Sequence, residues 1–151
     1  MDTIKGGKHQ QAIVSLAERK SRLAFIRKVE RKTSQRVSQA VMGLLRPVQH
    51  RVHTITADNG QEFADHETIA SGLDAGFYFA HPYASWERGL SENTNGLIRQ
   101  YFPKSKDFTT ITDREIQTAT DSLNNRPRKC LGFKTPNQVF FGNKPDVALS
   151  S

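Results

Sequence analysis

A carboxylate at the end of an apolar run is the first residue of this sequence with a possible chemical role. In residues 54–63, TITADNGQEF, the apolar stretch stops at Asp58, and Asn59 and Gly60 follow it. An acidic residue before Asn-Gly is common turn chemistry. The pattern leaves two interpretations open: Asp58 ends a strand, or it carries out chemistry at the end of that strand.

A second group of polar side chains lies on one face of a predicted helix within residues 85–105, SWERGLSENTNGLIRQYFPKS. At about 100° per residue, the apolar side chains gather on one side, and the other side carries Glu92, Asn95, Gly96 and Arg99. Glycine inside a helix costs roughly 1 kcal/mol relative to alanine, which favours a local need for close approach. A phosphate backbone could approach such a surface, although a single helical Glu is most often a solvated charge.

The two acidic residues are separated by a defined spacing. Residues 59–91, 33 in all, lie between Asp58 and Glu92. Asp2, just before the first strand-like stretch, is a third acidic candidate. Glu87 is a rival to Glu92, but it lies one helical turn too early to share the polar face.

Hydrophobic periodicity predicts the elements that position these residues. The expected strands are residues 10–18 and 22–30, which form a hairpin, and residues 52–58 and 76–82. The expected helices are Ser34–Val48 ending near Pro47, residues 66–73, the helix after Trp86, Asp113–Asn124 with Asp113 as its cap, and residues 135–142 with Thr135 as N-cap and Pro136 in the first position. Strands and helices in this order make an α/β domain with a central sheet covered by helices.

Length and composition restrict the class of protein. A chain of 151 residues suits one domain, expected over residues 1–142, with a loosely ordered polar tail at 143–151. Lys and Arg total 22 against 15 Asp and Glu, a formal net charge of +7 that favours a polyanionic partner. The single cysteine, Cys130, excludes an internal disulfide and a cysteine-rich zinc site.

No apolar run is long enough to span a membrane, so no membrane partner is expected. The first residues lack the apolar region of a signal peptide, which predicts a cytoplasmic location.

Four blocks of sequence carry a family resemblance. They are DTIKGGKHQQAIVSLAERKSR, TADNGQEFADH, FYFAHPYASWERGLSENTNGLIRQYFPK and LNNRPRKCLGFKTPNQVF, and they cover nearly the whole chain. In this order and with this spacing they resemble the catalytic domain of insertion sequence 30 family transposases, within the retroviral integrase superfamily. The resemblance implies a ribonuclease H-like fold, a mixed central sheet flanked by helices, and a catalytic Asp-Asp-Glu triad formed by Asp2, Asp58 and Glu92.

The implied triad has an electrostatic consequence. Three converging carboxylates repel one another unless divalent cations neutralise them, so Asp2, Asp58 and Glu92 are also the implied metal ligands. Oxygen ligands in an open arrangement suit Mg²⁺, for which Mn²⁺ can substitute. Two such ions, expected with DNA bound, can activate an attacking water or 3′-hydroxyl and stabilise the leaving oxygen. The implied activity is metal-dependent DNA cleavage and strand transfer.

The implied partner is double-stranded DNA, both element ends and target, bound by a homo-oligomer that we expect to be a dimer. The location implied is the bacterial cytoplasm, with association to the nucleoid when DNA is bound. Asn95 and Arg99 are assigned to phosphate positioning or active-site support. Backbone contacts are expected from basic side chains whose affinity depends on salt, namely Lys104, Lys106, Arg126, Arg128 and Lys129. A solvated basic loop accounts for any single one of them equally well.

Two departures from the family pattern leave other hypotheses open. Only Met1 precedes Asp2, so we expect this end of the chain to fray, and the upstream helix-turn-helix of the family is not in this sequence. The first alternative is a catalytically impaired DNA-binding or dimerising remnant of a transposase. The second is a stand-alone nuclease of the same fold.

Overall fold

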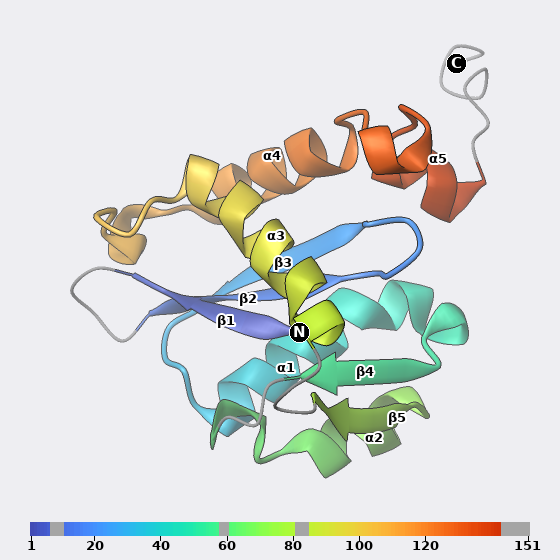
Figure 1. Ribbon diagram of the computed structural model, residues 1–151. Coiled ribbons are helices and arrows are strands. Elements are labelled where there is room, and N and C mark those ends of the chain that lie inside the picture. Colours follow the sequence, from blue (N-terminus) through green and yellow to red (C-terminus); the bar gives the residue numbers. More distant parts are fainter. Residues whose placement is uncertain (7–10, 58–60, 81–84, 143–151) are drawn as a thin grey trace.

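Three strands precede the first helix in the computed structural model (Figure 1), which describes residues 1–6, 11–57, 61–80 and 85–142. The strands are β1 (Asp2–Lys5), β2 (Ala12–Ala17), β3 (Ala24–Val29), β4 (Thr54–Ala57) and β5 (Gly76–Phe79). The α-helices are α1 (Ser34–Leu45), α2 (His66–Leu73), α3 (Ser85–Tyr101), α4 (Asp113–Asn124) and α5 (Pro136–Phe141). Short 3₁₀ turns occupy Arg46–Arg51, Gln61–Phe63, Phe108–Thr110 and Lys129–Leu131.

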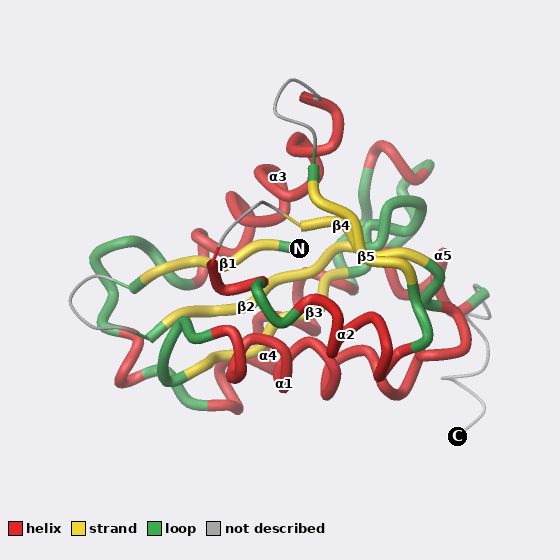
Figure 2. Tube along the Cα trace, turned by 90° about the horizontal axis from the view of Figure 1, so that it is seen from below, coloured by secondary structure: helices red, strands yellow, loops and turns green. Residues whose placement is uncertain are grey.

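The strands form two sheets, one antiparallel with three strands and one parallel with two. Strands β1, β2 and β3 form antiparallel neighbours, and β4 pairs with β5 in parallel. The two groups meet where β1 begins, because the amino group of Met1 donates a hydrogen bond to the carbonyl oxygen of Thr56 at 2.8 Å. Both views place the start of β1 beside the end of β4 (Figures 1 and 2).

Two hydrophobic clusters cover opposite faces of the antiparallel strands. Successive side chains of a strand point to opposite faces, so Val14 and Leu16 of β2 pack with α1 and α2, whereas Ile13 packs with α3 and α4. Strand β1 follows the same rule, because Ile4 lies in the α3 and α4 cluster. Asp2, two residues earlier on β1, shares that face, and α3 therefore runs over the strand end that carries it (Figure 1).

Three sequence expectations are wrong at the ends of elements. Thr112, not Asp113, caps α4, because its hydroxyl oxygen accepts from the backbone N–H of Glu115 at 3.1 Å in a capping box. Helix α1 ends at Leu45, and the chain continues as a 3₁₀ turn that accommodates Pro47. The end of the chain is expected to fray, yet Asp2 pairs with Ser15 in β1, a strand that the periodicity did not predict.

The other predicted helices and strands are present, although β4 begins at Thr54 and β5 ends at Phe79. Thr135 caps α5, Pro136 is its first residue, and the hairpin of β2 and β3 forms where predicted. None of the described helices is long and apolar enough to cross a membrane. The predicted tail at residues 143–151 lies outside the described residues.

Candidate active site

The amide of Asn95 joins α3 to two strands. Its Nδ2 donates to Oδ2 of Asp2 at 2.8 Å, and its Oδ1 accepts from the hydroxyl of Ser15 at 2.8 Å. Oδ1 of Asp2 accepts from the backbone N–H of Thr3 at 2.7 Å. The carboxylate of Asp2 is therefore oriented through both of its oxygens.

The local sequence explains why these three side chains meet. Asp2 and Ser15 are directly opposed in the β1–β2 register, so their side chains leave the sheet on the same face. Helix α3 covers that face, anchored by Ile98, which is fully buried one turn after Asn95. Ser15 is itself buried, and its hydroxyl needs the partner that Asn95 provides.

Glu92 lies one helical turn before Asn95 on the same face of α3. At 1.5 Å per residue, the two Cα positions are separated by about 4.5 Å along the helix axis. The residue is exposed, so its carboxylate can receive a ligand from solvent. The side chain of Glu87, its rival, lies outside the described residues, as does that of Asp58, with Asn59 and Gly60.

The described residues on both sides of Asp58 are firmly anchored. Ala57, the last residue of β4, is buried and pairs with Phe79, and its neighbour Thr56 accepts the hydrogen bond from Met1. Phe63, in the 3₁₀ turn that follows, is fully buried. Thus the end of β4, the start of β1 and the middle of α3 come together in one region, which is where the sequence placed the three acidic candidates.

Glu62 is a member of this region that the sequence analysis missed. Its Oε1 accepts from the Thr3 hydroxyl at 3.0 Å and lies 2.9 Å from Nζ of Lys32. Burial acts to raise the pKa of Glu62, but hydrogen bonds from its own backbone N–H, from Lys32 and from Thr3 outweigh burial and lower the pKa below 4.5. The contact ties the turn after residue 60 to β1. The signal in the sequence was a second carboxylate only four residues after Asp58.

The donor set fits a hard divalent cation. Asp2 and Glu92 offer carboxylate oxygens, the ligands that Mg²⁺ prefers, from elements that meet. Among the described residues, which do not include Asp58, no group of three His, Cys, Asp or Glu could hold a metal ion. Mg²⁺ often takes few protein ligands and completes its coordination with water and substrate phosphate, so two carboxylates are compatible with this metal.

Arg99 supports the site from the end of β1. Its Nη2 donates to the backbone oxygen of Lys5 at 2.9 Å and its Nη1 to that of Phe102 at 3.4 Å. Burial lowers the pKa of its guanidinium. The bond to Lys5 holds α3 against β1, whereas the bond to Phe102 closes the end of α3 itself.

The other predicted DNA contacts lie beyond the middle of α3. Arg126 donates to the Tyr101 hydroxyl at 2.9 Å, and Arg128 donates to the backbone oxygen of Leu123 at 3.0 Å. Lys106 lies 4.0 Å from a carboxylate oxygen of Glu115. Lys104 and Lys129 are exposed. Arg126, Arg128 and Lys129 lie in the connection that follows α4.

A pocket of about 270 Å³ lies next to the candidate site but does not belong to it. It is bounded by the end of β2, by residues 54–56 of β4, by Leu90 of α3 and by Phe140 of α5. Its carboxylate, Glu18, accepts hydrogen bonds from Ser21, and these outweigh burial and lower the pKa of Glu18. None of the predicted site residues that the structure describes lines this pocket.

Sequence comparison relates the chain to transposases of insertion elements. The transposase of IS4351 from Bacteroides fragilis is 50% identical, over 100% of this chain and 47% of that protein. The transposase of IS1086 from Cupriavidus metallidurans is 39% identical over 91% of the chain, and transposase InsI of IS30C from Escherichia coli K12 is 39% identical over 91%. The chain spans less than half the length of these relatives, covering 41% and 36% of the last two. No family model matches the sequence.

Structural comparison identifies the fold. The catalytic core domain of BIV integrase aligns with a TM-score of 0.70 at 18% identity, over 97% of this chain and 96% of that domain. The HTLV-2 integrase catalytic core domain in complex with magnesium, in its trimeric form, aligns with a TM-score of 0.69 at 20% identity, over 91% of this chain and 89% of that one.

The fold is therefore the ribonuclease H-like fold of integrase catalytic cores, as predicted. The predicted similarity to insertion sequence 30 family transposases is also confirmed, and this chain is a relative of insertion-element transposases.

Proposed function

We propose that this chain is the catalytic domain of a DNA transposase, which cleaves DNA and transfers strands with divalent cations held by Asp2, Asp58 and Glu92. The observation that carries the proposal is the contact of Asn95 with Asp2 at 2.8 Å, on the helix that carries Glu92. The 50% identity to the IS4351 transposase over 100% of the chain supports the same activity.

Five of the described residues have a role in this mechanism. Asp2 and Glu92 supply carboxylate oxygens, and Asn95 keeps the Asp2 carboxylate turned toward α3. The Ser15 hydroxyl orients the Asn95 amide by donating to its oxygen. Glu62 holds the turn after residue 60 against β1 by accepting from the Thr3 hydroxyl. The chemistry that bound Mg²⁺ or Mn²⁺ would supply is activation of the attacking oxygen and stabilisation of the leaving oxygen in an in-line displacement.

The proposed partner is double-stranded DNA, at the element ends and at the target. The net charge of +7 favours this partner.

We also propose a homodimer. The HTLV-2 integrase core is known in dimeric and trimeric forms, which supports self-association of this fold. The proposed location is the bacterial cytoplasm, on the nucleoid when DNA is bound.

Strand joining by the 151-residue protein tests the proposal. Oligonucleotides that carry the element's terminal repeats are incubated with Mg²⁺ or Mn²⁺, and nicked and joined products are separated on a gel. Glu92→Gln and Asp58→Asn are expected to reduce both products to background, because each removes a negative oxygen ligand of the metal. The matched control is Glu67→Gln on α2, an exposed residue outside the site, which is expected to keep full activity.

The outcome separates the alternative functions. Full joining activity in Glu92→Gln would overturn the assignment of the triad. Cleavage of unrelated DNA without joined products would favour a stand-alone nuclease. A thermal transition that Mn²⁺ does not shift, with salt-sensitive DNA binding retained, would favour an impaired DNA-binding remnant.

A further inference from the structure

The connection between α4 and α5 presents an aromatic ring to solvent. Phe133 is 71% exposed, compared with 59% for Tyr78 and 62% for Phe141. It is the second of two consecutive residues with left-handed backbone, after Gly132, and its φ is +67°. This conformation is unfavourable for a residue with a bulky side chain and persists where the surrounding structure imposes it.

Backbone hydrogen bonds impose the conformation of Phe133. Its N–H donates to the carbonyl oxygen of Arg128 at 2.8 Å, and the N–H of Arg128 donates to the carbonyl oxygen of Lys134 at 2.9 Å. Gly132 donates to the oxygen of Lys129 at 3.1 Å. These bonds close residues 128–134 into a tight loop. A ring on a fixed backbone loses little freedom when it binds a partner.

The segment that carries the ring is cationic. Residues 122–142 contain no Asp or Glu and carry four basic residues, Arg126, Arg128, Lys129 and Lys134. Burial lowers the pKa of Arg128, and the charges of Arg126 and Arg22 act in the same direction, against the opposing effects of Cys130 and Tyr101. Positive charges are thus held close together, and an approaching anion would relieve their repulsion.

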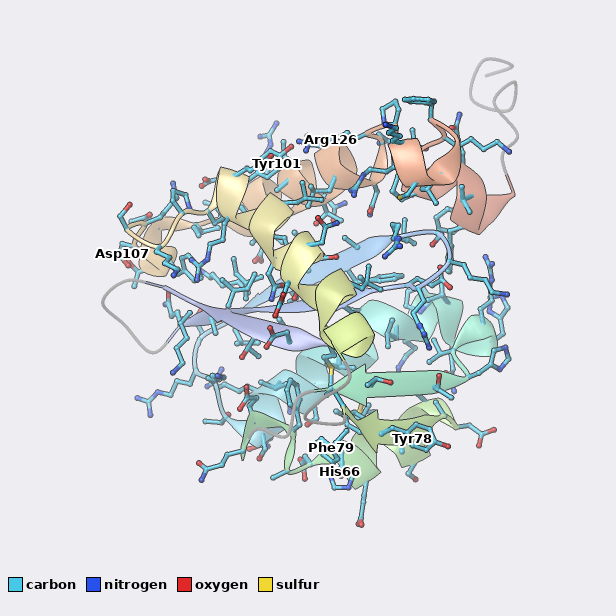
Figure 3. The ribbon with its side chains drawn as sticks, viewed as in Figure 1. His66, Tyr78, Phe79, Tyr101, Asp107 and Arg126 are labelled. Carbon is cyan, nitrogen blue, oxygen red and sulfur yellow. The ribbon has the colours of Figure 1, made fainter. Side chains whose placement is uncertain are left out.

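The loop is tied to the helix that carries the candidate active site. Arg126 and the Tyr101 hydroxyl, 2.9 Å apart, meet at the end of α3 (Figure 3). Tyr101 is about 9 Å from Asn95 along the helix axis at 1.5 Å per residue. One turn of B-DNA is about 34 Å long, so a duplex at the site is long enough to reach the loop.

We propose that residues 126–134 form a DNA-binding loop in which Phe133 stacks on a base while Lys129 and Lys134 neutralise phosphates. Aromatic faces stack on bases, and apolar side chains can enter between base steps. An apolar protein partner would explain the ring but not the four basic residues in the same segment. The inference rests on the proposed function in that the ligand is DNA, but it requires no metal ion and no strand joining.

DNA binding by Phe133 variants tests this inference. The 151-residue protein is titrated in EDTA against a duplex with a fluorescent base analogue, and affinity is measured by anisotropy. Phe133→Ala and Phe133→Gly are expected to weaken binding about tenfold and to remove the fluorescence change of the base. Phe133→Gly should keep or raise the thermal stability, because glycine adopts the left-handed backbone without strain. Tyr78→Ala is the control, an exposed ring that lies far from Arg126 (Figure 3).

A purely structural role would lower stability and affinity together in Phe133→Gly, which would overturn the inference. Unchanged affinity in both variants, or a change in self-association without a change in DNA affinity, would also overturn it. Phe133-dependent binding in a protein that fails to join strands would support this inference and overturn the proposed function. Normal strand joining together with unchanged DNA binding by Phe133→Gly would support the proposed function and overturn this inference.

Discussion

The middle and the end of α3 use polar side chains in different ways. At Asn95, amide, carboxylate and hydroxyl groups bond to one another between a helix and two strands, and Ser15 is buried. At Tyr101, Arg126 connects α3 to a loop whose lysines are exposed. Buried hydrogen bonds fix geometry and are screened little by salt, whereas exposed cations attract an anion from solution and are screened strongly. The first region fixes the position of a carboxylate, and the second is the region that we propose to bind DNA.

Among variants that leave the proposed metal ligands in place, the largest effect is expected from Asn95→Leu, which removes the amide and nearly keeps the volume. Strand joining should fall about 10- to 100-fold, because the orientation of the Asp2 carboxylate is lost. The free energy of unfolding should fall by about 1–3 kcal/mol, since the buried hydroxyl of Ser15 loses its partner. Rates are measured on gels and stability by urea denaturation.

A double-mutant cycle separates the two losses. Ser15→Ala combined with Asn95→Leu should cost less stability than the sum of the single variants, because no unpaired hydroxyl remains. The loss of activity should persist in the double variant. Gln117→Leu on the exposed face of α4 is the control for a polar-to-apolar change. Full joining activity in Asn95→Leu would show that Asp2 needs no support from α3.

A smaller effect is expected from Glu62→Gln. Its pKa is lower in the folded protein than the ordinary 4.5, so the folded state binds fewer protons than the unfolded state. The stability from Glu62 is therefore complete above pH 4.5 and is lost as the pH falls through the lowered pKa. At neutral pH the variant should be about 1 kcal/mol less stable, because the charge facing Lys32 is removed.

Urea denaturation at a series of pH values checks this prediction. The difference between wild type and Glu62→Gln should shrink as the solution becomes more acidic than pH 4.5. Glu67→Gln, an exposed change on α2, should alter stability by less than about 0.5 kcal/mol. A difference that stays constant down to acidic pH would contradict a role for the charge of Glu62.

The smallest effect is expected from Lys129→Gln and Lys134→Gln. Each should reduce the slope of log affinity against log salt by about 0.9, because one phosphate is no longer neutralised. The affinity should fall only a few-fold, and strand joining at saturating DNA should be unchanged. Binding titrations over a range of salt concentrations measure the slope, and Arg36→Gln on α1 is the control. Unchanged slopes would place the bound DNA elsewhere.

Much of the fold could be predicted because periodicity is a local property. The β2–β3 hairpin, α2 and the cap of α5 depend on residues close together in sequence. Strand β1 could not be predicted this way, since four residues give too short a pattern and its pairing partner, β2, supplies the stability. The Thr112 cap was missed because Thr112 and Asp113 are both common at helix starts, and the hydrogen bond decides between them.

The sequence by itself determined the acidic candidates, the 33-residue spacing and the polar face of α3, because these follow from residue order and helical geometry. Tertiary structure decided what each polar side chain does. Asn95 supports Asp2, Arg99 holds the end of β1, and Glu62 meets Thr3, a residue 59 positions away. Such contacts depend on strand register and on which helix covers which face, and residue order does not encode them locally.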